Sequence, residues 1–184
     1  MKKYVTLLLG AVVALLSISQ DSLAQSQLKL YVFDCGRLQF DSIVAFGIQD
    51  DETDVRELIV PCYMIEHEDG RLLWNAGLSP SLAETEGWVE QDGARARLDR
   101  TLPEQLADLG LDMDDFDYAS FSHMHFDHVG ATNELEGATV IMQRAEHDAA
   151  FADSVTVPGF EPSAYEGLRD EEFLIIEGDH DVFG

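Results

Sequence analysis

The chain has 184 residues and is strongly acidic, with 36 Asp and Glu residues against 11 Lys and Arg and a formal net charge of −25. Such a charge repels polyanions, which argues against nucleic acid as a partner. Apolar residues make up 46% of the chain, more than an intrinsically disordered protein contains. The length fits one domain, and neither an internal repeat nor a low-complexity tract divides it.

The amino terminus has the pattern of a secretory signal peptide. Two lysines precede an apolar stretch from Tyr4 to Ile18, and Ser22-Leu23-Ala24 offers a small-x-small cleavage site. The stretch is interrupted by polar and small residues and is short against the ~20 residues of a membrane span. We therefore predict that residues 1–24 direct export, to the periplasm or beyond, without a stable membrane anchor, and that residues 25–184 form the domain.

The predicted elements alternate between strands and helices. Asp69-Gly70 between two apolar runs is a strong signal for a hairpin turn. Thr101 and Glu104 resemble a helix capping box, and Gly110 marks the end of that helix. In chain order, we predict strands at 28–33, 42–48, 58–66 and 71–75, a polar segment, a helix at 101–110, a strand at 116–122, a strand at 138–142, a helix at 144–151 and a strand at 172–176. This order indicates the α+β class.

The two cysteines, Cys35 and Cys62, lie at the ends of predicted strands. In an oxidising compartment they can form a disulfide. Structural burial of two thiols is the alternative, and the sequence leaves both open. Neither cysteine is assigned to a metal.

Residues 123–128 read His-Met-His-Phe-Asp-His, in which four of six side chains can bind a metal. The run follows a short predicted strand and precedes Gly130, which places it on a tight loop at the end of a rigid element. By their spacing, His123 and His125 would share one ion, while Asp127 and His128 would face a second. Two such ions about 3.5–4 Å apart can bridge a water or hydroxide. Imidazole with one carboxylate suits zinc best, and other divalent metals stay open.

Zinc lowers the pKa of a bound water to about 7, so such a centre supplies hydroxide at neutral pH. The expected chemistry is hydrolysis of an ester, lactone or amide, with a small molecule as the substrate.

These residues carry a resemblance to a known family. SHMHFDHVG at 122–130 resembles the HxHxDH signature of the metallo-β-lactamase superfamily. Three further blocks are similar to the N-acyl-homoserine-lactonase-like, quorum-quenching branch, which brings the likeness to nearly all of residues 28–184. They are Leu30–Gly36, Pro61–Leu78 and Leu102–Gly110.

The resemblance implies an αββα sandwich of which this chain holds the N-terminal half to two thirds. It also implies that His123 and His125 bind the first of two zinc ions, and that Asp127 and His128 bind the second and orient the bridging hydroxide, with Asp127 as the catalytic residue. The family's remaining ligands are expected beyond Gly184, in a sequence interpreted as a fragment. The implied reaction opens a lactone such as an N-acyl homoserine lactone.

Two positions depart from the family pattern. Asn75-Ala76-Gly77 stands where the superfamily usually has Asp-Thr-Gly, and Asn75 can accept a hydrogen bond but lacks the charge that raises the basicity of a ligating His. Ala131 replaces a common second Gly, a change that we expect to be tolerated.

The other histidines have ordinary explanations. We expect His67 to be solvated at the hairpin tip, His147 to lie on a helix surface and His180 to be exposed in a charged turn, none of them a ligand.

Trp74, Tyr118 and Phe126 could line an apolar acyl-chain pocket, with burial in the core as the alternative. Two other functions stay open. One is an exported β-lactamase of the same superfamily. The other is an inactive metal-binding pseudoenzyme, suggested by Asn75-Ala76 and by the incomplete set of ligands.

Overall fold

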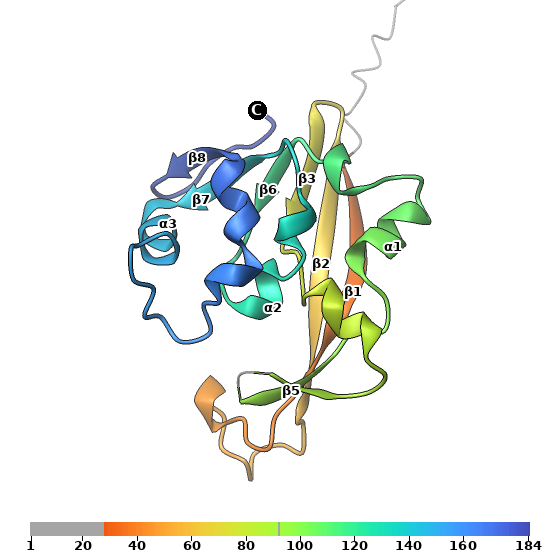
Figure 1. Cartoon of the computed structure of the whole chain (residues 1–184), viewed down its shortest axis with the longest axis vertical. Coiled ribbons are helices and arrows are strands. Elements are labelled where there is room, and N and C mark those ends of the chain that lie inside the picture. The colour runs from red at the N-terminus through yellow and green to blue at the C-terminus, as the bar shows by residue number, and fades with distance from the viewer. Residues whose placement is uncertain (1–27, 92) are drawn as a thin grey trace, which may run out of the picture.

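The computed structural model describes residues 28–91 and 93–184, so the predicted signal peptide lies outside the described residues. They form one mixed eight-stranded sheet in the order β4-β5-β1-β2-β3-β6-β7-β8 (Figure 1). The strands are β1 (Lys29–Gln39), β2 (Glu57–His67), β3 (Gly70–Trp74), β4 (Val89–Gln91), β5 (Ala94–Arg97), β6 (Tyr118–Ser120), β7 (Thr139–Gln143) and β8 (Glu172–Ile176). The predicted α+β class is confirmed.

The sheet has an antiparallel half and a parallel half. Strands β1 to β5 pair antiparallel, and β1 and β2 form a long ribbon with a register shift between Asp34 and Arg37. Strands β3, β6, β7 and β8 pair parallel, which requires crossover connections. The carboxyl ends of these four strands therefore lie side by side, and the loop after β6 begins there.

Helical segments cover one face of the sheet, and several of them lie in front of the strands in Figure 1. The helices are α1 (Leu102–Ala107), α2 (Phe126–Val129) and α3 (Arg144–Ala150). Short 3-10 segments span Val44–Phe46, Pro80–Glu84, Met113–Asp115, Thr132–Glu134, Pro162–Ala164 and Glu166–Asp170. Within the described ranges, none of these helices has the length and apolar content needed to cross a membrane.

The core lies between the sheet and this helical layer. Alternate strand residues such as Met64, Leu73 and Ala119 are fully buried there, together with Leu106 of α1 and Val129 of α2. Alternation puts the neighbouring residues on the opposite face, where Leu30, Val32 and Ile59 are more than 60% exposed. Of the two sheets in the predicted αββα sandwich, the described residues form one, with the helices on one of its faces.

The helix signals in the sequence are confirmed for α1. Thr101 Oγ1 accepts a hydrogen bond from the Glu104 backbone N–H at 3.2 Å, and Glu104 Oε2 accepts one from the Thr101 N–H at 2.9 Å. The helix ends at Ala107, earlier than predicted, and the chain turns through Gly110 with φ 74°.

One predicted strand is absent, and one hairpin was not predicted. Residues 42–48 contain a 3-10 turn in place of a strand, because the Ile43 N–H bonds to Asp50 Oδ1 at 3.1 Å and Gly47 turns the chain with φ 79°. The segment described from the sequence only as polar contains the β4–β5 hairpin. In β5, buried residues alternate with more exposed ones, and the buried positions are Ala94 and Ala96, which are only weakly apolar.

Candidate metal centre

The four predicted metal ligands lie on the loop and the single helical turn that follow β6. The backbone of His125 is extended, with φ −68° and ψ 151°, and helix α2 begins at the next residue. The Phe126 N–H donates to the Gly159 carbonyl at 3.0 Å, which ties this start to the 151–161 loop. Because the backbone changes from extended to helical at this point, the side chains of the loop and those of α2 lie on the same side of the chain.

The structure brings all four side chains together. The ring centroid of His123 lies 4.3 Å from that of His125 and 4.1 Å from that of His128. Asp127 Oδ2 lies 3.4 Å from His128 Nε2. All four are half-buried. The short run therefore forms one cluster of three imidazoles and a carboxylate, with His123 in contact with both other rings.

The Asn75-Ala76-Gly77 loop forms backbone hydrogen bonds with the segment that carries this cluster. The Ala76 N–H donates to the His128 carbonyl at 2.7 Å, and the Gly130 N–H donates to the Gly77 carbonyl at 2.7 Å. A Cβ on Gly130 would lie 2.2 Å from the Ser79 nitrogen, so only glycine fits this close approach. The loop therefore fixes the carboxyl-terminal end of α2.

Asn75 reaches the motif through Ser122. Its side chain is 5% exposed, and Oδ1 accepts a hydrogen bond from the Ser122 N–H at 2.9 Å. Ser122 Oγ lies 3.1 Å from His123 Nδ1 and 3.0 Å from His128 Nδ1. The predicted hydrogen-bonding role of Asn75 thus operates through a serine hydroxyl.

Glu146 of α3 forms a second side-chain hydrogen bond to the backbone of the motif. Its Oε1 accepts a hydrogen bond from the Met124 backbone N–H at 2.7 Å, between the two histidines of the loop. Sequence reasoning missed both Glu146 and Ser122. Ser122 stands within the quoted motif and could have been noticed, whereas the contact of Glu146 depends on tertiary packing and leaves no local signal.

Burial lowers the pKa of two of the histidines. The pKa of His123 is lowered chiefly by burial and also by His125, against the opposing effects of Asp127 and Glu146. The pKa of His128 is lowered chiefly by burial, and Asp127 opposes the shift. Both rings are therefore neutral at neutral pH, the form that binds a metal.

The donor set fits zinc. Because the Nδ1 atoms of His123 and His128 both face Ser122, the Nε2 atoms are the nitrogens left for a metal. Three imidazoles and one carboxylate are donors that zinc accepts. His123, His125, Asp127 and His128 would hold the metal.

The remaining histidines lie elsewhere. The prediction that His67 is solvated was wrong, because its side chain is only 12% exposed and stacks on Phe183 with centroids 4.8 Å apart. Its ring lies with Glu68 and Asp69 in a hairpin-turn group whose donor atoms are within 4.8 Å of one another and could hold a metal ion. His147 packs against Phe151 and Phe173 on α3. His180 is exposed.

A cavity of about 430 Å³ opens beside the cluster. All four predicted ligands line it, and its other wall is apolar. That wall contains Leu38, Phe40, Phe46, Leu58, Val60 and Phe126.

Of the three aromatic residues predicted to line a pocket, only Phe126 does so. Strand alternation places Trp74 and Tyr118 on the opposite face of the sheet, where Tyr118 packs against Phe183. The pocket alternative therefore does not hold for these two, and the sequence left it open because it does not indicate which face of the sheet meets the metal ligands.

Cys35 and Cys62 form a disulfide between β1 and β2, and both residues are buried. The bond lies against the loop that supports the cluster. A Cβ on Gly77 would meet Cys35 Cβ at 2.3 Å and Cys62 Sγ at 3.0 Å. The first of the two alternatives left open by the sequence is therefore the one that the structure shows.

The chain is similar to known lactone-hydrolysing proteins. It is 28% identical over 163 residues to an N-acyl homoserine lactonase of Bacillus cereus, covering 84% of this chain and 61% of the relative. It is 31% identical over 140 residues to the N-acyl homoserine lactonase AiiB of Agrobacterium fabrum, covering 69% and 49%. The chain thus spans about 61% of the length of the first of these relatives.

Solved structures agree with these relatives. A quorum-quenching N-acyl homoserine lactone hydrolase superposes with a TM-score of 0.64 at 26% identity, covering 84% of this chain and 59% of that one. An N-acyl homoserine lactone hydrolase with N-hexanoyl-L-homoserine bound at its catalytic metal centre gives a TM-score of 0.63 at 26% identity, covering 83% and 61%. The family model of the metallo-beta-lactamase superfamily matches residues 55–183. The chain, whose HMHFDH cluster occupies the end of a parallel strand within this match, therefore belongs to the metallo-beta-lactamase superfamily.

Proposed function

We propose that the protein is a zinc-dependent hydrolase that opens the lactone ring of an N-acyl homoserine lactone. The observation that carries this proposal is the cavity in which His123, His125, Asp127 and His128 face an apolar wall. An acyl homoserine lactone has the same two parts, a polar ring that must be hydrolysed and an apolar chain that must be bound. The lactonase relatives support the choice of substrate.

The residues divide the work as follows. The three imidazoles and Asp127 would hold their share of a two-metal centre, which would supply a nucleophilic water at neutral pH and polarise the ring carbonyl. The Asp127 carboxylate, half-buried beside His128, is placed to accept a hydrogen bond from the attacking water and so to orient it. Water adds across the ring ester, which gives the hydroxy acid.

The apolar wall selects the substrate. Phe40 and Phe46 pack edge to face with centroids 5.1 Å apart in the segment that joins β1 to β2. Each methylene of an acyl chain that this wall buries contributes about 0.8 kcal/mol. We therefore expect KM to fall as the acyl chain lengthens.

The test is a parallel assay of the protein, produced from its full coding sequence, against acyl homoserine lactones of increasing chain length and against a β-lactam. We expect zinc-dependent opening of the lactones and no turnover of the β-lactam. The reverse preference would identify a β-lactamase, and turnover of neither substrate by zinc-loaded protein would favour the pseudoenzyme.

Two matched variants check the ligand assignment. His125→Ala should abolish zinc occupancy and activity together, because it removes one ligand from the cluster. His180→Ala, at an exposed position outside the cluster, should retain both. Retention of zinc and activity by His125→Ala would contradict the assignment.

We also propose that the protein is exported. The signal-peptide pattern of residues 1–24 supports this, and the Cys35–Cys62 disulfide is typical of an oxidising compartment. A fusion of residues 1–30 to alkaline phosphatase, which is active only after export, should be active in a bacterial host. The same fusion with Lys2 and Lys3 changed to Glu should lose most of that activity, and an inactive wild-type fusion would refute export.

A further inference from the structure

Ser122, immediately before the motif, has a hydroxyl with three polar neighbours. Its Oγ lies 3.3 Å from Asn75 Oδ1, 3.1 Å from His123 Nδ1 and 3.0 Å from His128 Nδ1. A serine hydroxyl has one proton to donate and two lone pairs to accept with. Three neighbours therefore use its full hydrogen-bonding capacity, and the position of its one proton decides whether each Nδ1 must donate or accept. At His128 this acts against Asp127, whose Oδ2 lies 3.4 Å from Nε2 and favours a proton there.

Asn75 determines where that proton goes. The Ser122 backbone N–H donates to the same Asn75 atom at 2.9 Å. A backbone N–H can only donate, so this atom is the amide oxygen and the orientation of the amide is fixed. The amide oxygen can only accept, so the Ser122 hydroxyl donates its proton to Asn75. The two lone pairs of Oγ then face the two imidazoles, and only Nδ1–H donors satisfy them.

The backbone holds Asn75 firmly in place for this role. Its φ of 62° lies in the left-handed region, which asparagine adopts more readily than most residues. Its backbone N–H donates to the Ser120 carbonyl at 3.0 Å, and its side chain is buried. A residue fixed in this way provides a rigid acceptor for the Ser122 hydroxyl.

We propose that Asn75 and Ser122 are positioning residues that hold His123 and His128 in the Nδ1–H tautomer, with both Nε2 lone pairs free for the metal. A neutral amide is sufficient for this role because Ser122 lies between it and the rings. The inference rests on the metal centre of the proposed function but does not depend on the reaction. Without Ser122, each ring would return to the Nε2–H tautomer that histidine prefers in water, and binding a metal through Nε2 would first require that proton to move.

The tautomers can be observed directly in the metal-free chain. Two-bond ¹H–¹⁵N correlation spectra at pH 8 separate Nδ1–H from Nε2–H rings, and His123→Gln and His128→Gln assign the signals. We expect both rings to be Nδ1–H in the wild type and Nε2–H in Ser122→Ala. Ser122→Thr keeps the hydroxyl at a position with room for a methyl group, because Ser122 is exposed, and should keep the wild-type tautomers.

Zinc affinity, measured by competition with a chelator, provides a second readout. Loss of a hydrogen-bond partner of a ligating histidine typically costs 10–100-fold in metal affinity, so we expect a loss of about that size in Ser122→Ala and recovery in Ser122→Thr. Ser120→Ala is the matched control. It removes a hydroxyl two residues upstream that donates to the Ile141 carbonyl at 2.8 Å and contacts no histidine.

Nε2–H rings in the wild type, or unchanged tautomers in Ser122→Ala, would overturn the inference. A loss of affinity in Ser122→Ala that Ser122→Thr does not restore would also count against it, since the hydroxyl would then not be the cause. If the wild-type chain binds no zinc, the metal centre of the proposed function fails, and the tautomer measurement still decides the inference.

Discussion

The side chain of Glu146 and the backbone N–H of Met124 are joined by a 2.7 Å hydrogen bond, although the two residues lie 22 positions apart. Met124 is fully buried and stands between His123 and His125. A carboxylate that accepts from a backbone N–H forms a stronger bond than a neutral acceptor does. Helix α3 therefore fixes the loop that carries the first two histidines.

Removal of this carboxylate should weaken the metal centre. Glu146→Ala leaves the Met124 N–H without a partner, at a cost of roughly 1–3 kcal/mol, and should lower zinc affinity because the loop is no longer held. Glu146→Gln keeps an acceptor and should lose much less. Chelator competition and chemical denaturation of both variants would measure these effects. Equal behaviour of the two variants would show that the hydrogen bond does not hold the loop.

The disulfide should stabilise the whole domain. Cys35 and Cys62 are 27 residues apart, and a loop of that length corresponds to about 3–4 kcal/mol by the chain-entropy model. We expect the Cys35→Ala/Cys62→Ala variant to lose about that much free energy of unfolding in urea titrations. Reduction by a phosphine should destabilise the wild type and leave the double variant unchanged. A reductant effect on the double variant would show that the loss has another cause.

Acidification should destabilise the metal-free protein through His123 and His128. Burial lowers the pKa of both rings below 6.5 in the folded state, so as the pH falls below 6.5 the unfolded chain takes up protons before the folded protein does. Their contribution to stability is therefore complete above pH 6.5 and declines below it. Ring titrations by NMR should give pKa values under 6.5. His128→Asn should show a smaller loss of stability between pH 6.5 and 5 than the wild type, and an equal loss would contradict this account.

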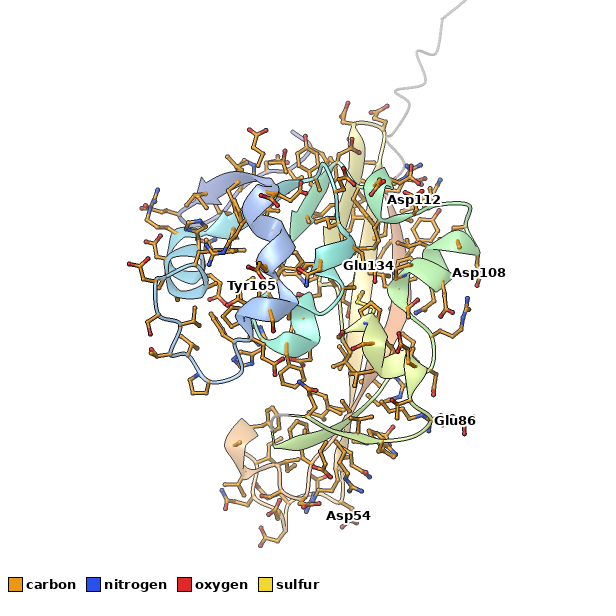
Figure 2. The ribbon with its side chains drawn as sticks, viewed as in Figure 1. Asp54, Glu86, Asp108, Asp112, Glu134 and Tyr165 are labelled. Carbon is orange, nitrogen blue, oxygen red and sulfur yellow. A yellow bond between two sulfur atoms is a disulfide. The ribbon has the colours of Figure 1, made fainter. Side chains whose placement is uncertain are left out.

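Salt should stabilise the protein. Its net charge is −25, and Figure 2 shows acidic side chains such as Asp54, Glu86 and Asp108 spread over different parts of the molecule. The Debye length falls from about 10 Å at 0.1 M to about 3 Å at 1 M salt, which screens this repulsion. We expect the thermal midpoint to rise with NaCl by about 2–4 °C for each kcal/mol of repulsion relieved.

The control for this prediction is a variant in which Asp54, Glu86 and Asp108, all exposed, are changed to the corresponding amides. It should show a weaker dependence on salt than the wild type. A midpoint that does not change with NaCl would mean that the charges are too far apart to destabilise the fold.

The sequence predicted elements best where the signal was local. The hairpin signalled by Asp69-Gly70 and the capping box at Thr101 depend on residues a few positions apart, and both are present, although the two turn residues are Glu68 and Asp69. The β4–β5 hairpin was missed because its buried positions are Ala94 and Ala96, whose burial depends on where β5 lies beside β1. Residues 42–48 were wrongly predicted as a strand because a hydrogen bond from the Ile43 N–H to Asp50, seven residues along the chain, turns the chain there.

The sequence by itself determined the donor atoms of the candidate site, because all four lie in one run of six residues whose spacing needs only a strand, a tight loop and a helical turn. It also determined the superfamily. Only the tertiary structure decided what surrounds those donors. Asn75, Ser122 and Glu146 act through contacts across the sheet and from α3, and the apolar wall of the cavity comes from β1, β2 and their connection. Such contacts depend on strand register and on the packing of distant elements, and no local pattern in the sequence encodes them.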